Sequence, residues 1–466
     1  MKRSIPAEAG GNEMDRSRRA FVKKLGLTLT GGLYGIDHLR TSQPFNEALP
    51  VSSSKDLWSD IQSQFLFDPG ITYMNTGTEG SAPKPVFDDY VRILKQFTTS
   101  PTQATFHDDD LNYFQENNRE KVAQFVGAEK DEIVLTGNTT MGINTVLFGL
   151  DYAPGDEIIT TLHDHIAEIS PSKVLRERRD VKFTQLELGS PARSKDEIIR
   201  LFERAITNSR FRPKVLLICH INFTTGLRMP VKELCQLARK HDMISIVDGA
   251  HALGMLKLDL HDMGCDFYST AGHKWLNCVP GTGVLYMKGG EANTRNLWPV
   301  LSEFYDFRDE DGNLYDIATQ MQLRGQNDTP AYMAMVSAIR FQKEIGIGTI
   351  EGRILELNNY LRQRIVDTWG KESLLAPPPG AEELSSGMAS FIPSSSPPKR
   401  YDKEFITAIP EKLSDEYGIW IRYVDFFARR NHMRRGKKTY VLRVSTHIFN
   451  DTDQIDRLIE AVEAVA

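Results

Sequence analysis

From about residue 55 onward, short runs of β-branched and apolar residues alternate with segments of helical spacing. Residues 231–241 show the helical pattern, because apolar side chains recur at positions 231, 234, 237 and 238. Another helix is expected over residues 139–150. Strands that alternate with helices are typical of a mostly parallel sheet with helices on both faces. The expected strands are Glu132–Leu135, Glu157–Thr160, Val181–Leu188, Val215–Cys219, Ile244–Val247 and Gly283–Met287.

A second, smaller domain is expected toward the end of the sequence. The alternation stops near Asn327–Pro330, and a long helix is expected from Ala331 to about Ile345. The proline-rich stretches Ala376–Gly380 and Pro393–Lys399 predict loops of an α+β domain that closes with the helix Asp451–Val465. The predicted organisation is a signal and linker in residues 1–45, a large α/β domain in 46–325 and a small α+β domain in 326–466.

Composition narrows the class of protein. The chain has 466 residues, of which 40% are hydrophobic and 25% charged, as in ordinary globular proteins. Its formal net charge of −6 gives no general attraction to nucleic acid, and no apolar run has the roughly 20 residues of a stable membrane span. Four cysteines are too few for a disulfide scaffold in a chain of this length. These features leave a large folded protein, and an enzyme fits best.

The first forty residues resemble a targeting signal. Arg18 and Arg19 precede Phe21 and a short, weakly apolar stretch from Leu25 to about Ile36. This order is typical of a twin-arginine export signal, and it predicts a periplasmic or exported protein carried by the twin-arginine machinery in folded form. The alternative is a basic tail that runs into an amphipathic helix, which leaves the protein in the cytoplasm.

Two residues that follow expected strands carry the main chemical signal. Asp248 comes directly after Ile244–Val247, and ligands of open α/β sheets bind beyond the carboxyl ends of strands. Lys274 lies in a polar loop before a Gly/Pro turn and the next strand. This pair suits pyridoxal phosphate, because the lysine can form the Schiff base and the carboxylate can hold a proton on the pyridine nitrogen. Either residue alone is more often a helix cap or a solvated side chain.

Other polar residues follow the same strand ends. Thr139 and Thr140 open a helix, where backbone N–H groups and hydroxyls form an anion site of the kind that a cofactor phosphate requires. His165 can stack on an aromatic ring, and Asn222 can bind a phenolic oxygen through its amide. A simple helix cap and ordinary loop residues are the alternatives for each position taken alone.

Together these motifs resemble the class V aminotransferase family of fold-type I pyridoxal-phosphate enzymes over about residues 65–460. The run Gly272-His273-Lys274-Trp275-Leu276 resembles the isopenicillin-N epimerase-like branch. The resemblance implies a large, mostly parallel sheet of the seven-stranded type with a smaller C-terminal α+β domain, and a homodimer with sites at the subunit interface. It also implies Lys274 as the Schiff-base lysine, Asp248 as the partner of the pyridine nitrogen and His165 as the residue stacked on the ring.

The same resemblance implies the remaining contacts. Arg443 is expected to bind the substrate α-carboxylate, because its planar fork suits that group bidentately. One departure concerns the Gly-Thr that reaches the phosphate from a neighbouring subunit in the family, where this chain has Gln326, whose amide can still donate a hydrogen bond. The expected partners of the phenolic oxygen are Asn222 and His251, and those of the phosphate are Thr139, Thr140, His273 and, as a weaker candidate, Thr270.

The expected reaction takes place at the α-carbon of an amino acid or related amine, as a transamination or an epimerisation. Cysteine desulfurases of the family need a cysteine in the C-terminal region, whereas all four cysteines here fall between positions 219 and 278. A C–S or C–C lyase and a non-catalytic ligand-binding relative remain as alternatives. No Cys/His spacing predicts a metal site, and the basic run 429–438 predicts a solvated hairpin rather than a nucleic-acid contact.

Overall fold

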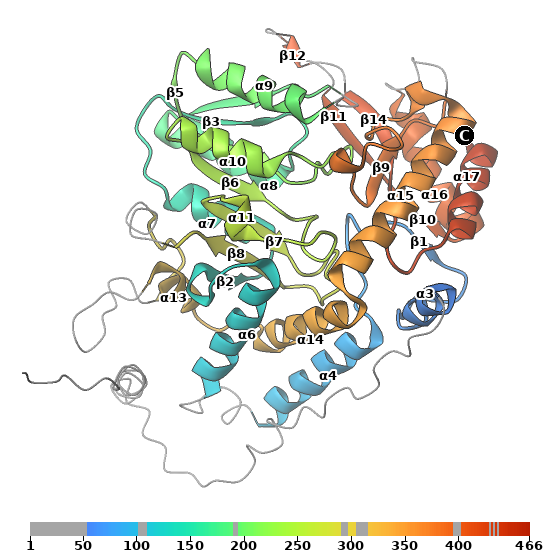
Figure 1. Cartoon of the computed structure of the whole chain (residues 1–466), viewed down its shortest axis with the longest axis horizontal. Helices are drawn as coiled ribbons and strands as arrows, with labels where there is room; N and C mark the ends of the chain where they lie inside the picture. Colours follow the sequence, from blue (N-terminus) through green and yellow to red (C-terminus); the bar gives the residue numbers. More distant parts are fainter. Residues whose placement is uncertain are drawn as a thin grey trace, which may run out of the picture.

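The chain folds into a sheet domain and a smaller domain packed beside it (Figure 1). The structure is a computed structural model that describes residues 54–100, 110–189, 194–289, 297–303, 316–394, 402–427, 430–431, 434–435 and 438–466. The twin-arginine motif expected at Arg18 and Arg19 lies outside the described residues. None of the described helices combines the length and the apolar character that crossing a bilayer requires.

A seven-stranded sheet forms the centre of the large domain, in the order β2-β8-β7-β6-β5-β3-β4. β8 pairs antiparallel with both of its neighbours, and the pairs β7-β6, β6-β5, β5-β3 and β3-β4 are all parallel. The mostly parallel α/β sheet that the sequence predicted is therefore confirmed. The strands are β2 (Ile133–Thr136), β3 (Asp156–Thr161), β4 (Lys182–Leu186), β5 (Arg212–Cys219), β6 (Ile244–Asp248), β7 (Phe267–Ala271) and β8 (Gly283–Met287).

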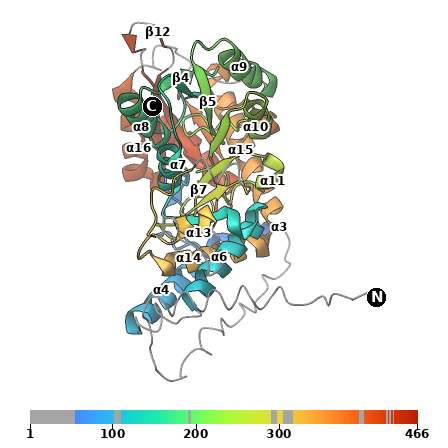
Figure 2. The same ribbon diagram turned by 90° about the vertical axis from the view of Figure 1, so that its left-hand side faces the viewer.

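Both faces of this sheet are covered by helices, which lie on either side of the strands in Figure 2. Along β5, Val215 and Leu217 pack in one hydrophobic cluster while Leu216 and Ile218 pack in another. Because successive side chains of a strand point to opposite faces, a strand covered on both sides is apolar throughout. One face carries α7 (Thr139–Gly149), α8 (Ile166–Arg179) and α13 (Ile317–Gln322), and the other carries α6 (Asp110–Val126), α9 (Lys195–Thr207), α10 (Val231–Lys240) and α11 (Leu260–Met263).

The small domain has an antiparallel sheet of order β11-β14-β9 packed with three helices around its own hydrophobic cluster. The basic run 429–438 connects the antiparallel strands β11 and β14. This arrangement is the predicted α+β architecture. Its elements are β9 (Met388–Phe391), β11 (Arg422–Phe427), β12 (Arg430–Asn431), β13 (Arg434–Arg435), β14 (Lys438–Ser445), α15 (Ile347–Trp369), α16 (Lys403–Tyr417) and α17 (Thr452–Val465).

Segments at the start of the described chain connect the two domains. After α3 (Ser54–Ser63), strand β1 (Thr72–Tyr73) pairs in parallel with β10 (Ile419–Trp420) of the small domain. Helices α4 (Lys84–Thr99) and α14 (Thr329–Ile345) then pack on each other. The apolar residues of α14 belong to the hydrophobic cluster of the large domain, whereas α15 reaches from that cluster into the core of the small domain. The domain boundary expected at residue 325 remains a prediction.

Candidate active site

Asp248 lies at the end of β6, and Lys274 lies beyond the end of the neighbouring strand β7. Asp248 is the last residue of β6 and is 3% exposed, and Lys274 follows β7 after a short turn. The carboxylate of Asp248 accepts a hydrogen bond from the backbone N–H of Ala250 at 2.8 Å, which fixes its orientation. The backbone directly after Asp248 is also fixed to β7, because the N–H of Gly249 donates to the carbonyl of Ser269 at 2.7 Å. The two chemical groups are thus carried on adjoining, hydrogen-bonded strands.

The amine of Lys274 lies among charged groups of the same site. Burial lowers its pKa to about 8, because desolvation disfavours the ammonium ion. The nearby carboxylate of Asp248 acts in the opposite direction, and the guanidinium of Arg443 lowers the pKa further. These interactions show that the structure brings together three residues that are distant in sequence. They also provide a neutral amine at a much lower pH than an ordinary lysine does.

His165 faces the same group of charges from the start of α8. It is the N-cap residue of this helix, and its Nδ1 accepts a hydrogen bond from the backbone N–H of Ala167 at 3.2 Å. Its ring lies edge-on to Phe223, with ring centroids 5.2 Å apart. Burial lowers the pKa of His165, and the charge of Asp248 opposes that shift. A neutral imidazole fixed in this way can stack on an aromatic ring.

Several buried polar atoms around Asp248 and Lys274 have no partner within the described part of the chain. Both amide atoms of Asn222, the hydroxyl of Thr139 and the Nδ1 of His273 belong to this set. Buried polar groups are ordinarily hydrogen-bonded, so such a set indicates a ligand. Pyridoxal phosphate fits it, since the amide suits the phenolic oxygen, and the hydroxyl, the imidazole and the N-terminus of α7 suit the phosphate.

Of the other residues predicted to contact the cofactor, two are hydrogen-bonded within the protein and two are exposed. The Nδ1 of His251 accepts a hydrogen bond from Trp275 Nε1 at 3.3 Å, and the hydroxyl of Thr270 donates to the carbonyl of Gly249 at 2.7 Å. Thr140 is exposed at the start of α7. Gln326 is exposed between α13 and α14, and no described contact connects it to Lys274. The role of each of these residues stays a prediction.

Arg443 presents its guanidinium to the site from β14. It is 2% exposed, and it donates to the carbonyl of Phe223 at 3.0 Å and to the hydroxyl of Thr78 at 2.9 Å. Arg422 is its partner in the β11-β14 register and donates to the same hydroxyl at 3.3 Å. Burial lowers the pKa of Arg443 to about 9, and the charge of Arg422 adds to that shift. Two cations around one neutral hydroxyl form a position suited to an anionic substrate group.

The sequence-based prediction missed the segment that covers this side of the site. Gly80 donates its N–H to the carbonyl of His273 at 2.8 Å, and a Cβ at Gly80 would lie 2.0 Å from the carbonyl oxygen of Lys274. Gly77 donates to the hydroxyl of Ser445 at 3.0 Å. Only residues without side chains fit such close approaches. The signal for this segment was its glycines at positions 70, 77 and 80, which flank Thr78.

The family model for class-V aminotransferases matches residues 73–458, which is most of the chain. The chain belongs to the class-V aminotransferase family. Similar members include the isopenicillin N epimerase of Amycolatopsis lactamdurans, which is 29% identical over 88% of this chain and 98% of its own length. A probable cysteine desulfurase of Halalkalibacterium halodurans is 32% identical over 55% of this chain and 62% of its own length.

Solved structures support the same fold. The cysteine desulfurase of Thermococcus onnurineus NA1 superimposes with a TM-score of 0.70, covering 87% of this chain and 98% of that one at 22% identity. As a member of the class-V aminotransferase family, this chain is a pyridoxal-phosphate-dependent enzyme. The unpartnered polar atoms around Lys274 agree with that cofactor.

The cysteines of this family member lie in packed surroundings. All four are buried, and burial raises the pKa of each thiol. Cys278 packs four residues after Lys274, with its sulfur 4.0 Å from the carbonyl oxygen of Ala331. A thiol is reactive as a thiolate in a partly exposed, electropositive position, which these four do not occupy. Among the described residues, no group of three or more His, Cys, Asp or Glu side chains is arranged to hold a metal ion.

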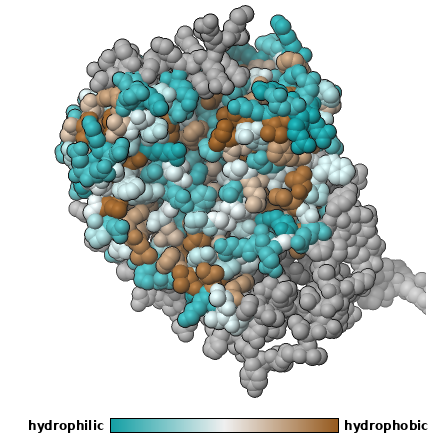
Figure 3. Space-filling view, turned by 180° about the vertical axis from the view of Figure 1, so that it is seen from behind, coloured by the Kyte–Doolittle hydropathy of each residue, from teal (hydrophilic) through white to brown (hydrophobic). Residues whose placement is uncertain are grey.

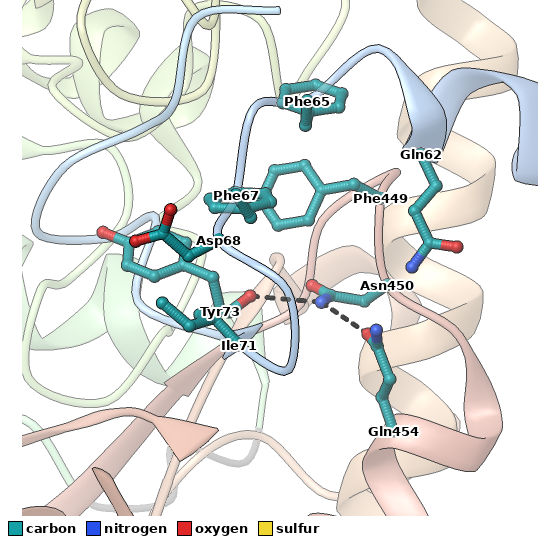
Figure 4. Close-up of a pocket in the computed structure, with 9 residues that line it drawn as sticks. All are labelled: Gln62, Phe65, Phe67, Asp68, Ile71, Tyr73, Phe449, Asn450 and Gln454. Carbon is teal, nitrogen blue, oxygen red and sulfur yellow. Dashed lines mark hydrogen bonds between the residues drawn. The ribbon is translucent and has the colours of Figure 1, made fainter. Parts of the chain in front are cut away.

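A pocket of about 170 Å³ lies where the segment around β1 packs on the small domain (Figure 4). Asn450 donates from its amide to the carbonyl of Tyr73 at 3.1 Å and to the side chain of Gln454 at 2.9 Å. Phe67 and Phe449 pack together at its centre, with ring centroids 5.0 Å apart. These contacts hold Tyr73 against the small domain. Between Tyr73 and Arg443, the hydroxyl of Thr78 donates to the side-chain oxygen of Asn75 at 2.7 Å.

Proposed function

We propose that this enzyme moves a proton at the α-carbon of an amino acid or related amine, in a transamination or an epimerisation. The observation that carries the proposal is the meeting of Lys274, Asp248 and Arg443 beside buried polar atoms that have no partner. When bound, pyridoxal phosphate supplies an electron sink for the electron pair left at the α-carbon. The residues of the chain supply attachment, orientation and proton transfer.

Each proposed role follows from the surroundings of the residue. Asp248 is buried and oriented by Ala250, so its carboxylate can hold a proton on the ring nitrogen. The guanidinium of Arg443 has an unpartnered Nε and is suited to the substrate carboxylate. The pKa of Lys274, at about 8, allows its amine to take a proton from the α-carbon and return it near neutral pH. His165, Asn222, Thr139 and His273 are proposed to hold the cofactor.

Transamination and epimerisation differ in where the proton returns. Return of the proton to the opposite face of the α-carbon would invert the configuration, whereas amino transfer would follow if the proton were not returned to that carbon. The isopenicillin N epimerases of Amycolatopsis lactamdurans and Streptomyces clavuligerus, 29% and 27% identical over 98% of their own lengths, favour inversion. Inversion of the α-carbon with uptake of deuterium from D₂O, in the absence of a keto acid, is the expected sign of epimerisation. Keto-acid-dependent amino transfer is the expected sign of transamination.

The direct test of the cofactor site is attachment to Lys274. Purified protein should absorb visible light, and borohydride treatment should leave the cofactor on the peptide that contains Lys274. The variant Lys274→Ala should show no attached cofactor after the same treatment. A wild-type protein that stays colourless after incubation with pyridoxal phosphate would contradict the proposed chemistry.

A lyase that cleaves a C–S or C–C bond is the second candidate. It is favoured by similarity to desulfurases, including the one that is 32% identical over 55% of this chain. The position of all four cysteines between residues 219 and 278 argues against a persulfide-forming enzyme of the usual arrangement. Release of pyruvate, alanine or sulfide from small amino acids would identify a lyase, and their absence alongside racemisation or amino transfer would favour the first proposal.

Assembly and export complete the proposal. A homodimer is supported by Phe87, Val91 and Leu94, which form an apolar stripe on α4 that is 42–45% exposed in the single chain. Hydrophobic patches also interrupt the hydrophilic surface seen in Figure 3.

Export rests on the sequence alone, and the variant with Arg18→Lys and Arg19→Lys should accumulate in the cytoplasm. Unchanged periplasmic recovery of that variant would overturn the export proposal.

A further inference from the structure

Glu168 is a buried acid behind the site that none of the roles above uses. It is the third residue of α8, one turn after His165, and its side chain is 0% exposed. A glutamate at this position of a helix often turns back to bond the N-cap backbone. Here neither carboxyl oxygen has a hydrogen-bond partner in the described part of the chain. The side chain is therefore directed into the interior without a donor to balance a negative charge.

The titratable groups that face Glu168 are acidic as well. They are Asp164 from the turn after β3, Asp248 from β6 and the thiol of Cys219 from β5. Asp164 is already satisfied, because it accepts from the hydroxyl of Thr160 and from both the N–H and the hydroxyl of Thr161. The carboxyl of Asp248 lies within hydrogen-bonding reach of Glu168. The surroundings of Glu168 thus contain two carboxyl groups and a thiol, and the charges that shift its pKa are those of Asp164 and Asp248.

Two ionised carboxylates in contact in a buried position are unstable, because each is desolvated and they repel each other. One proton between them removes the repulsion and creates a hydrogen bond. Glu168 is the natural holder, since Asp164 has three donors and Asp248 has the N–H of Ala250, whereas Glu168 has none. Burial and the neighbouring acids raise the pKa of Glu168 well above its usual range.

We propose that Glu168 is a positioning residue, a neutral carboxylic acid that donates a hydrogen bond to Asp248. A hydrogen bond to the charged form of an acid favours that form, so Glu168 keeps Asp248 ionised toward the ring nitrogen of the cofactor. The inference rests on the proposed function, because the charge of Asp248 matters chemically only through that nitrogen. The first turn of α8 would then contribute to cofactor binding twice, directly through His165 and indirectly through the effect of Glu168 on Asp248.

The test compares two substitutions in the full-length holoenzyme. Glu168→Gln keeps a donor without a titrating proton, and Glu168→Leu removes the donor at similar size. With ¹⁵N-labelled pyridoxal phosphate, the ring nitrogen should stay protonated from about pH 6 to 9 in the wild type and in Glu168→Gln. In Glu168→Leu it should shift toward the neutral form, and the dissociation constant of the cofactor should rise at least about tenfold. An unchanged nitrogen signal in Glu168→Leu would overturn the proposal.

A second measurement does not depend on the stability of Glu168→Leu. The infrared spectrum of the wild-type protein at neutral pH should contain the carbonyl stretch of a protonated, buried carboxyl group. That band should be lost in Glu168→Gln and kept in the control Glu177→Gln, which alters an exposed residue of the same helix. Absence of the band in the wild type, or its survival in Glu168→Gln, overturns the role of Glu168 whether or not cofactor binds. Failure of the wild type to take up cofactor would instead defeat the proposed function.

Discussion

At the scale of single residues, we expect the protonation of the Lys274 amine to control how fast the site takes up its cofactor. The pKa of Lys274 is lowered to about 8, so about a tenth of it is neutral at pH 7, against less than about a thousandth of an ordinary lysine. Because only the neutral amine attacks an aldehyde, the rate at which apoenzyme captures pyridoxal phosphate should rise with pH and level off above about pH 8. Stopped-flow absorbance measures this rate.

The control for that profile is Asp248→Asn. The carboxylate of Asp248 raises the pKa of Lys274 against the effect of burial, so its removal should move the midpoint to lower pH. A wild-type rate that keeps rising to about pH 10, as for a solvated lysine, would show that burial does not tune the amine.

The two arginines should contribute unequally to substrate binding. Arg443 is 2% exposed and faces Lys274, whereas Arg422 is exposed on the neighbouring strand. Loss of a charged hydrogen bond costs about 1.5–3 kcal/mol, so Arg443→Met should lower kcat/KM by about 10- to 150-fold. Arg422→Met should lower it by less than about tenfold. Steady-state kinetics with one amino acid and its carboxamide analogue measure both effects, and equal losses for the two substrates would contradict carboxylate recognition.

Some of these residues could be predicted from the sequence, and others could not. Asp248 and Lys274 could be predicted because each follows an apolar strand, and strand ends meet at one edge of a sheet. The proposed role of Glu168 could not be predicted, because it depends on the fold bringing Asp164 and Asp248 next to this side chain. A glutamate early in a helix is otherwise an ordinary capping residue.

At the scale of elements, the segment that leads from β1 to α4 needs glycine at position 80. A methyl group there would overlap the carbonyl of Lys274, at 2.0 Å, so Gly80→Ala must displace the lysine loop or the segment itself. We expect a loss of about 1–3 kcal/mol in unfolding free energy and weaker retention of cofactor. Thermal unfolding and absorbance after gel filtration measure the two effects.

Gly352→Ala is the matched control for this substitution. Gly352 is exposed within α15, and nothing lies within 4 Å of the position of an added Cβ. Because alanine favours helix, this change should leave cofactor retention intact and stabilise the protein by up to about 1 kcal/mol. If Gly80→Ala and Gly352→Ala behaved alike, the close approach of Gly80 to Lys274 would contribute nothing to stability or to cofactor retention.

The elements also show where sequence patterns stop being informative. Six strands of the large sheet were predicted, but β7 (Phe267–Ala271) was not, because its Tyr-Ser-Thr core looks like a polar loop. Ser269 and Thr270 are nonetheless buried and hydrogen-bonded to Thr139 and Gly249. The reversed direction of β8 was equally hidden, since the alternation of side chains is the same in either direction.

For the whole molecule, the proposed dimer gives a further prediction. The stripe formed by Phe87, Val91 and Leu94 exposes large apolar surface that a second chain can cover. Sedimentation should give about twice the chain mass of 52.7 kDa. Val91→Glu combined with Leu94→Glu should shift the protein toward monomer, while Arg92→Gln, which alters an exposed side chain away from the stripe on the same helix, should not. A dimer that persists in the double variant would place the interface elsewhere.

The site takes residues from near both ends of the described chain, with Thr78 beside Arg443 and Tyr73 held by Asn450. A growing polypeptide therefore has no complete site until the ribosome has passed position 450. We therefore expect pyridoxal phosphate to be captured late in biosynthesis, after the strand that carries Arg443 and the turn that carries Asn450 have been made.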